Sequence, residues 1–368
     1  MTIRPLPNRS LLKLVAAAVP VLGVLIMVPS FVGTYQLQLV IYGLIAAIAA
    51  LGFNLLLGYT GLLSFGHSAY FGVGAYSVAF VVEHLGPHSM EFYLLLGIPI
   101  VAITSALFGY ICVRHTQIFF GILTLAISQV VYSLALKLYW VTGGSDGLRV
   151  PRPALFLGLL SFSGPQGFQH FVKSYYYYVL GIFVICVILM WVIVHSPFGK
   201  ALQGIRDNEV RARFLGLRIR RFRWISFLVS GTFTGVAGIL WVPLNGLTTP
   251  DVLYWTFSGE IVFTALLGGF RNFTGPIVGG MVFTYLRTYA VASTEYWQLL
   301  LGGFRNFTGP IVGGIVFTYL KTYAVATTEY WQLLLGVVLV TLVLVLPTGI
   351  VGAVSRLAQR WRERGAAP

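Results

Sequence analysis

Several stretches of this chain stay apolar over about 20 residues, the length that an α-helix needs to cross a lipid bilayer. Hydrophobic residues make up 57% of the chain and charged residues only 9%, with a mean hydropathy of +0.85. A typical soluble domain carries about 25% charged residues. The composition therefore predicts an all-α polytopic membrane protein, in which residues 1–368 form a single membrane domain.

The apolar runs predict about 9–11 transmembrane or re-entrant helices, with ends that are uncertain by a few residues. The expected spans are 11–31, 36–57, 62–82, 92–113, 118–138, 175–195, 224–245, 256–269, 276–292 and one from about 331 to 346. The third of these is rich in glycine and serine, which predicts an irregular helix. Four tyrosines, Tyr175–Tyr178, open the sixth span and are typical of an interfacial aromatic belt.

The segment 196–223 between two spans is basic and poor in acids. It holds eight of the 24 lysines and arginines, but only Asp207 and Glu209 as acids. By the positive-inside rule, this loop and the basic N-terminus face the cytoplasm, which places the 140–173 loop outside. Apolar residues among the charges predict a short amphipathic helix. Two interpretations stay open: the helix docks a soluble partner, or the loop is a solvated determinant of topology.

A near-exact tandem repeat occupies the last third, because residues 267–300 recur as 301–334. The copies differ only by Met281 to Ile315, Arg287 to Lys321 and Ser293 to Thr327. Ancient transporter repeats are only weakly similar, so this repeat indicates a recent duplication or an assembly artefact. The second copy adds one apolar segment, 310–325. We expect one copy to form a re-entrant or interfacial hairpin, or else the basic tail to be forced outside.

Polar side chains within the apolar runs are the candidates for a translocation pathway, since such residues usually face the bundle interior. They are Asn54, Ser64, His67, Thr124, Gln129, Asp146 and Glu260. Glycines between residues 52 and 76 permit close helix packing, or a broken helix whose freed backbone lines a cavity. The alternative for each polar residue is structural: internal hydrogen bonding within the packed helices, a turn for Asp146, and a helix start at the interface for Glu260.

Missing motifs exclude several kinds of chemistry. The chain has no G-x-x-x-x-G-K-[ST] loop for ATP, no H-E-x-x-H and no G-x-S-x-G nucleophile elbow. Its six histidines are scattered, so no metal site is expected. The net charge of +14 comes from basic residues at span ends and in one loop, which does not favour nucleic-acid binding. We therefore do not expect an intramembrane enzyme, whereas these absences do not exclude a channel.

Taken in order, several motifs resemble the membrane permeases of branched-chain amino acid ABC importers, in particular their M-type (LivM) subunit. The motifs are GFNLLLGYTGLLSFGHSAYFGVGAY, GILTLAISQ, TGGSDGL, SPFGKALQGIRDNEVRARFLGL, ISFLVSGTFTGVAGIL and WQLLLGVVLVTLVLVLPTGIVG. The resemblance covers roughly residues 35–352, apart from the extra 34 residues of the repeat.

This resemblance implies alternating access driven by partner subunits in the cytoplasmic (inner) membrane of a bacterium or archaeon. The implied partners are an H-type second permease, two cytoplasmic ATPases that bind the ATP, and a periplasmic or lipid-anchored binding protein; the chain itself needs no cofactor. A coupling helix around 199–216 would dock on an ATPase, with Gly199, Arg206, Glu209, Arg211, Ala212, Arg213 and Gly216 as its candidate residues. A urea or short-amide importer stays an alternative, as does an ion-coupled secondary transporter that uses Glu260.

Overall fold

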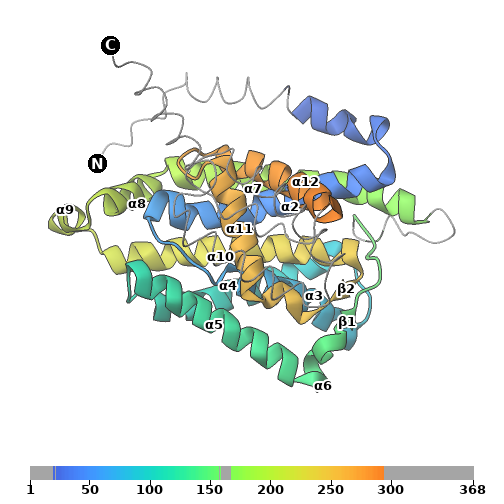
Figure 1. Cartoon of the computed structure of the whole chain (residues 1–368), viewed down its shortest axis with the longest axis horizontal. Coiled ribbons are helices and arrows are strands. Elements are labelled where there is room, and N and C mark those ends of the chain that lie inside the picture. The colour runs from blue at the N-terminus through green and yellow to red at the C-terminus, as the bar shows by residue number, and fades with distance from the viewer. Residues whose placement is uncertain (1–19, 21, 157, 159–166, 294–368) are drawn as a thin grey trace, which may run out of the picture. The chain divides into compact units, whose positions relative to one another are not determined.

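The computed structural model describes residues 20, 22–156, 158 and 167–293. Its compact unit up to Tyr285 is a bundle of helices, and a second unit begins at Leu286, within the last described helix. The long helices are α2 (Thr34–Asn54), α3 (His67–Leu85), α4 (Met90–Cys112), α5 (Gln117–Lys137), α7 (Gly167–His195), α10 (Ile219–Asn245), α11 (Trp255–Gly268) and α12 (Gly275–Ser293) (Figure 1). An apolar helix at Leu22–Phe31 precedes them.

Five helices of the described residues are long and apolar enough to cross a membrane, which agrees with an all-α polytopic membrane protein. They are Thr34–Thr60, Met90–Cys112, Ile118–Lys137, Gly167–His195 and Ile219–Asn245. The helix α11 has only 14 residues and covers about 21 Å, less than the bilayer core of about 30 Å. The 3-10 turn η3 (Pro250–Leu253) precedes it and packs on α3, since a Cβ on Gly72 would lie 2.1 Å from Leu253.

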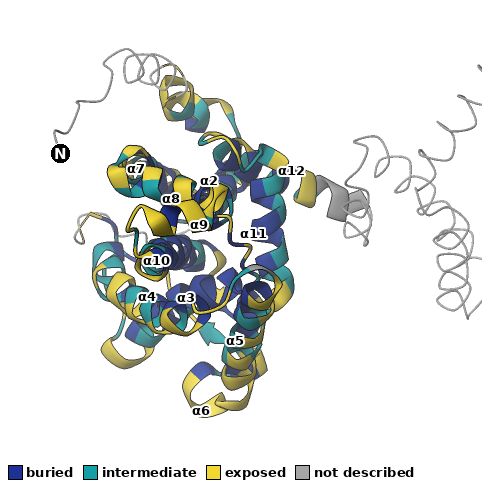
Figure 2. Cartoon of the chain, turned by 90° about the vertical axis from the view of Figure 1, so that its left-hand side faces the viewer, coloured by how far each residue is buried: buried dark blue, intermediate teal, exposed yellow. Residues whose placement is uncertain are grey.

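The core lies where α10 crosses α2 and α3, as the buried residues in Figure 2 show. The backbones of α3 and α10 approach so closely that only glycine fits between them. A Cβ on Gly238 would lie 1.9 Å from the Phe71 carbonyl oxygen, and one on Gly74 would lie 2.1 Å from that of Gly235. Small residues at such crossings allow the van der Waals packing that joins helices within a membrane. By contrast α4, α5 and α7 expose large apolar side chains on their outer faces.

The prediction of a loop over 140–173 is wrong at residues 167–173, because α7 begins at Gly167 rather than near residue 175. The first half folds into α6 (Tyr139–Thr142), the 3-10 turn η2 (Gly144–Asp146) and strand β1 (Leu148–Arg149). Strand β1 pairs antiparallel with β2 (Leu247–Thr248), at the end of the bundle opposite α8 and α9 (Figure 1). This pairing joins the segment after η2 to the segment after α10, which are about 100 residues apart in the sequence.

The prediction of an aromatic belt is wrong for Tyr175 and Tyr176, which are fully buried within α7. The Tyr175 hydroxyl donates to the Leu240 carbonyl at 2.5 Å, and that of Tyr176 donates to the Leu25 carbonyl at 2.6 Å. Because α7 starts two turns earlier than expected, these tyrosines lie inside the helix and bind its neighbours.

The tandem repeat is described only in part. The end of α11 and all of α12 belong to its first copy. Residues 294–334, the expected span near 331–346, the basic tail, and residues 11–19 and 21 of the 11–31 span lie outside the described residues.

Candidate functional site: a broken helix and an exposed docking face

The helix α2 breaks after Asn54 and the chain reverses through an irregular segment, as the glycine-rich sequence predicts. A π-helical turn, η1 (Leu55–Thr60), follows α2 and ends at Gly61, whose φ is +75°. The Thr60 hydroxyl also donates to the Leu55 carbonyl at 2.9 Å, across the width of this turn. Residues 61–66 then have no helical structure, and α3 starts at His67. Single π-turns of this kind frequently occur at functional sites.

Three of the predicted pathway residues surround this break and are buried: Ser64, His67 and Thr124. The Thr124 hydroxyl accepts from the Phe65 backbone N–H at 3.1 Å and donates to the Gly121 carbonyl at 2.9 Å. The Nδ1 atom of His67 lies 3.1 Å from the Ser64 hydroxyl oxygen, within hydrogen-bond distance. Its Nε2 lies 2.8 Å from the Ser230 hydroxyl of α10. These side chains are satisfied by one another and by the backbone, so they brace the broken helix.

A second polar cluster, formed by three serines, was not recognised as such from the sequence. Ser68, Ser128 and Ser258 come from α3, α5 and α11, and all three are buried. The Ser68 hydroxyl lies 2.7 Å from that of Ser128 and 2.8 Å from that of Ser258, while the Leu253 carbonyl lies within 3.2 Å of the first two. In the sequence these residues appear only as serines within apolar segments, and this pattern does not predict which serines form hydrogen bonds with one another.

The remaining pathway candidates take no part in these hydrogen bonds, although Asn54 lies at the break itself as the last residue of α2. Asn54 is buried at the end of α2, and its Oδ1 has no hydrogen-bond partner among the described residues. Gln129 is half-buried on α5, and Glu260 is buried in the second turn of α11. Asp146 is exposed in η2, where its carboxylate accepts from the Tyr139 hydroxyl at 3.4 Å. The structure therefore does not gather all seven predicted residues into one site.

The loop after α7 is tied to the break by Arg206. This residue lies on helix α8 (Pro197–Asp207), and its guanidinium donates a short hydrogen bond to the Gly58 carbonyl in the π-turn. The same group forms an ion pair with Asp207 at 3.0 Å. The aliphatic part of the Arg206 side chain packs closely on Gly61, because a Cβ on Gly61 would lie 2.8 Å from Arg206 Cγ. Arg206 therefore points into the bundle rather than toward a partner.

The predicted single helix around 199–216 is two helices, which corrects the sequence interpretation. The chain turns at Asn208, with φ −157° and ψ 102°, and the Asn208 side chain caps α9 (Glu209–Phe214) by accepting from the Arg211 N–H at 2.9 Å. Gly216, with φ +80°, ends α9 in the left-handed conformation that favours glycine. At the start of α8, a Cβ on Gly199 would lie 2.1 Å from the Val194 carbonyl oxygen, so this turn requires glycine.

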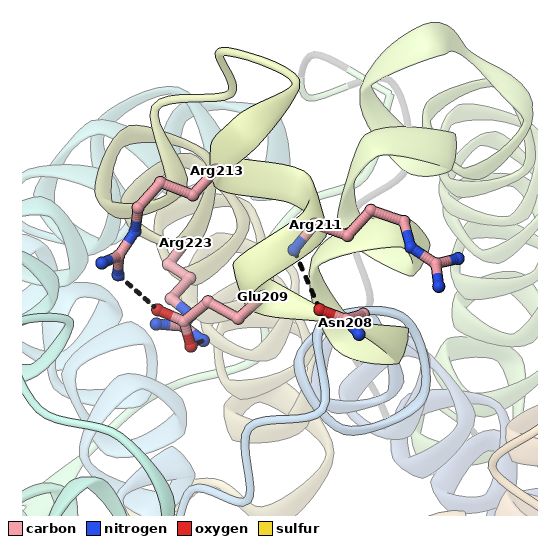
Figure 3. Close-up of polar contacts among 5 residues, drawn as sticks. All are labelled: Asn208, Glu209, Arg211, Arg213 and Arg223. Atoms are coloured by element: carbon pink, nitrogen blue, oxygen red, sulfur yellow. Dashed lines mark hydrogen bonds and ion pairs between the residues drawn. The ribbon is translucent and has the colours of Figure 1, made fainter.

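One face of α9 packs back on the bundle. Glu209 forms ion pairs with Arg213 at 3.3 Å and with Arg223 of α10 at 2.8 Å (Figure 3). The hydrogen bond from Arg223 holds the pKa of the Glu209 carboxyl below its usual value, and Arg213 adds to this effect. Ala212 is buried against Ile205 and Ile219. Three of the predicted coupling residues, Glu209, Ala212 and Arg213, thus have partners within the chain.

The opposite face of α9 is exposed and mainly apolar. Its apolar side chains are Val210, Phe214 and Leu215, which are 64%, 87% and 75% exposed. Arg211 lies on the same face, and its side chain points away from Glu209 in Figure 3. We call these four residues the docking face. Of the predicted coupling residues only Arg211 belongs to it. Phe214 was missed, although its spacing of four from Val210 places both on one side of a helix.

Comparison with known proteins identifies the chain's family. A family model described as "Branched-chain amino acid transport system / permease component" matches residues 35–303, which include the broken helix and the docking face. The chain belongs to this permease family. Its members are transport permeases, and with the apolar helices described above the family places the chain among multi-pass membrane proteins.

Curated relatives carry names that agree with this family. The high-affinity branched-chain amino acid transport system permease protein LivM of Escherichia coli (strain K12) is 26% identical over 270 residues, covering 69% of this chain and 63% of LivM. LivM of Salmonella typhimurium is 26% identical over 287 residues, covering 73% of this chain and 66% of that LivM. LivH of Salmonella typhimurium is 23% identical over 265 residues, covering 68% of this chain and 83% of LivH. The chain thus spans slightly less than two thirds of the two LivM proteins. No solved structure matches the chain.

Proposed function

We propose that this chain is a permease subunit of an ATP-driven importer for branched-chain amino acids. In this proposal it forms the pathway with a second, H-type permease. Two cytoplasmic ATPases supply the energy, and a periplasmic or lipid-anchored binding protein delivers the substrate. The N-terminus and the 196–223 loop face the cytoplasm. The chain binds no ATP or other cofactor itself and catalyses no reaction. Support comes from the family match over residues 35–303 and from the names of its relatives.

The single structural observation that carries this proposal is the docking face of α9. Phe214 is 87% exposed, at the end of the bundle where the 196–223 loop lies. A large apolar side chain that protrudes beside a cation suits a partner groove with an apolar pocket and an acidic rim. Burying Phe214 on binding is worth about 1.5–3 kcal/mol. We infer that the partner is a soluble ATPase whose surface carries such a groove.

The coupling route runs from the docking face to the broken helix. The helix α9 is tied to α10 through Glu209 and Arg223, and α8 is tied to the π-turn through Arg206 and Gly58. A partner that moves α9 therefore pulls on both the long central helix and the break between α2 and α3. This chain converts the partner's movement into a change at the break, which is the part of the bundle with non-helical backbone.

The test is uptake of radiolabelled leucine, with urea as a parallel tracer, by cells that lack their own importers and express this chain with its partner subunits. Phe214→Ala and Arg211→Glu should each abolish most uptake and reduce co-purification of the ATPases, while the chain still reaches the membrane. The matched controls are Phe119→Ala, a 73% exposed phenylalanine on α5, and Arg218→Glu, an exposed arginine outside the docking face.

Three outcomes would change the proposal. Normal uptake by both docking-face variants would refute the role of α9. Uptake of urea instead of leucine would keep the mechanism and replace the substrate. Leucine uptake that follows an ion gradient without ATP, and that is lost in Glu260→Gln, would establish a secondary transporter.

A further inference from the structure

Two arginines from different helices converge on one exposed tyrosine. The guanidinium carbon of Arg114, just after α4, lies 4.9 Å from the ring centroid of Tyr110. That of Arg220, in the first turn of α10, lies 5.2 Å from the same centroid. Both contacts fall within the range of cation–π interactions. We call these three residues the Tyr110 cluster. Arg220 lies in the first turn of α10, which follows α9 after a short link, so the cluster is at the same end of the bundle as α8 and α9 (Figure 1).

Among the described residues, no carboxylate balances the positive charge of this cluster. The two guanidinium carbons lie within about 10 Å of each other, because both are close to one ring. The three ion pairs found among the described residues involve Arg206, Arg213 and Arg223, so neither Arg114 nor Arg220 pairs with a described carboxylate. Both side chains are exposed. Two like charges at this separation repel each other, and an anion close to both guanidinium groups would be attracted by both.

An apolar stripe on α4 leads directly to the cluster. Its residues are Ile103, Leu107 and Ile111, which are 61%, 61% and 49% exposed. The spacing of four residues places them on one side of the helix. Behind the stripe, the Trp224 indole N–H donates to the Ala106 carbonyl at 2.9 Å and joins α10 to α4. A ligand with an anionic end and a long apolar tail would match both the cluster and the stripe.

We propose that the Tyr110 cluster binds the phosphate group of an anionic phospholipid, whose acyl chain lies along the stripe on α4. Basic groups at the cytoplasmic edge of transmembrane helices attract anionic headgroups, while the bilayer supplies the lipid at high local concentration. Arginine suits this role, because its planar guanidinium donates two parallel hydrogen bonds to a phosphate. The bound lipid bridges α4 and α10, the helix that also carries Arg223.

Native mass spectrometry of the full-length chain, purified in mild detergent, tests this proposal. Phosphatidylglycerol should stay bound to the wild type more tightly than phosphatidylcholine, which has the same phosphate but no net charge. Arg114→Gln with Arg220→Gln should weaken phosphatidylglycerol binding about 30-fold, which corresponds to about 2 kcal/mol, or 1 kcal/mol per arginine. The control, Arg218→Gln with Arg221→Gln, removes the same charge from exposed arginines nearby and should have little effect.

Two further measurements separate the possible sources of the anion. Excess inorganic phosphate should not displace phosphatidylglycerol; displacement at comparable concentration would show that the acyl chain contributes nothing and would overturn the lipid assignment. A photo-crosslinking residue in place of Leu107 should form lipid adducts in native membranes, and this test holds even where the double variant does not fold. Adducts with a protein subunit instead, or equal lipid loss in both double variants, would also overturn it.

Discussion

Replacing Arg206 by methionine isolates the contact between α8 and the broken helix. The substitution keeps a long unbranched side chain over Gly61 and removes the guanidinium that donates to the Gly58 carbonyl. A hydrogen bond to a charged group contributes about 1.5–3 kcal/mol. Since 36% of the Arg206 side chain is exposed and solvent weakens the bond, we expect a loss of about 1–2 kcal/mol, below the middle of that range. The ion pair with Asp207, whose side chain is 66% exposed, adds little.

Thermal unfolding of the purified chain in detergent measures this loss. For a chain of 368 residues the unfolding entropy is about 0.8 kcal/mol/K, so the melting temperature of Arg206→Met should fall by about 1–3 °C. Arg211→Met is the matched control, because it removes an exposed guanidinium from the docking face and should leave the melting temperature unchanged. In the uptake assay both variants should lose transport, Arg206→Met with its ATPases still bound and Arg211→Met without them. A stable, fully active Arg206→Met would refute the coupling between α8 and the π-turn.

Other contacts make further predictions. Arg223 lowers the pKa of the Glu209 carboxyl in the folded chain, so their ion pair stabilises the fold above the unfolded pKa of about 4.5, and this stabilisation is lost as the pH falls through the lowered pKa. In a pH series, the melting temperatures of wild type and Glu209→Gln should therefore converge in acid. At neutral pH the two proteins should differ in stability by less than about 1 kcal/mol. Gly199→Ala should destabilise by more than about 1 kcal/mol in the same melting assay, since its Cβ would lie 2.1 Å from a carbonyl oxygen, whereas Gly204→Ala in the same helix meets nothing within 4 Å and should be neutral or stabilising. His67→Ala should cost about 2–5 kcal/mol, because it opens a cavity and leaves two buried hydroxyls without their partner; a melting temperature equal to that of wild type would contradict the brace.

The apolar runs, the basic loop and the irregular glycine-rich segment could be predicted from the sequence because each depends on local physics. A membrane helix satisfies its own backbone hydrogen bonds, so length and composition suffice to place it. The break before α3 was predictable for the same reason, since a run of glycines weakens a helix wherever it packs. Even so, local signals misplaced the start of α7, because the apolar residues of 167–174 are too few to mark a span alone.

Only the tertiary structure decided which way the side chains of the basic loop point. A sequence of alternating charges and apolar residues looks the same whether Arg206 turns inward to Gly58 or outward to a partner. Glu209 forms an ion pair with Arg223 because α9 packs next to α10. Ser68 forms a hydrogen bond with Ser258, which is 190 residues away in the sequence. Such contacts depend on how helices cross, and a crossing is set by close packing of surfaces distant in sequence. For this reason the family and fold class were evident from the sequence, whereas the docking face, the brace and the Tyr110 cluster required the structure.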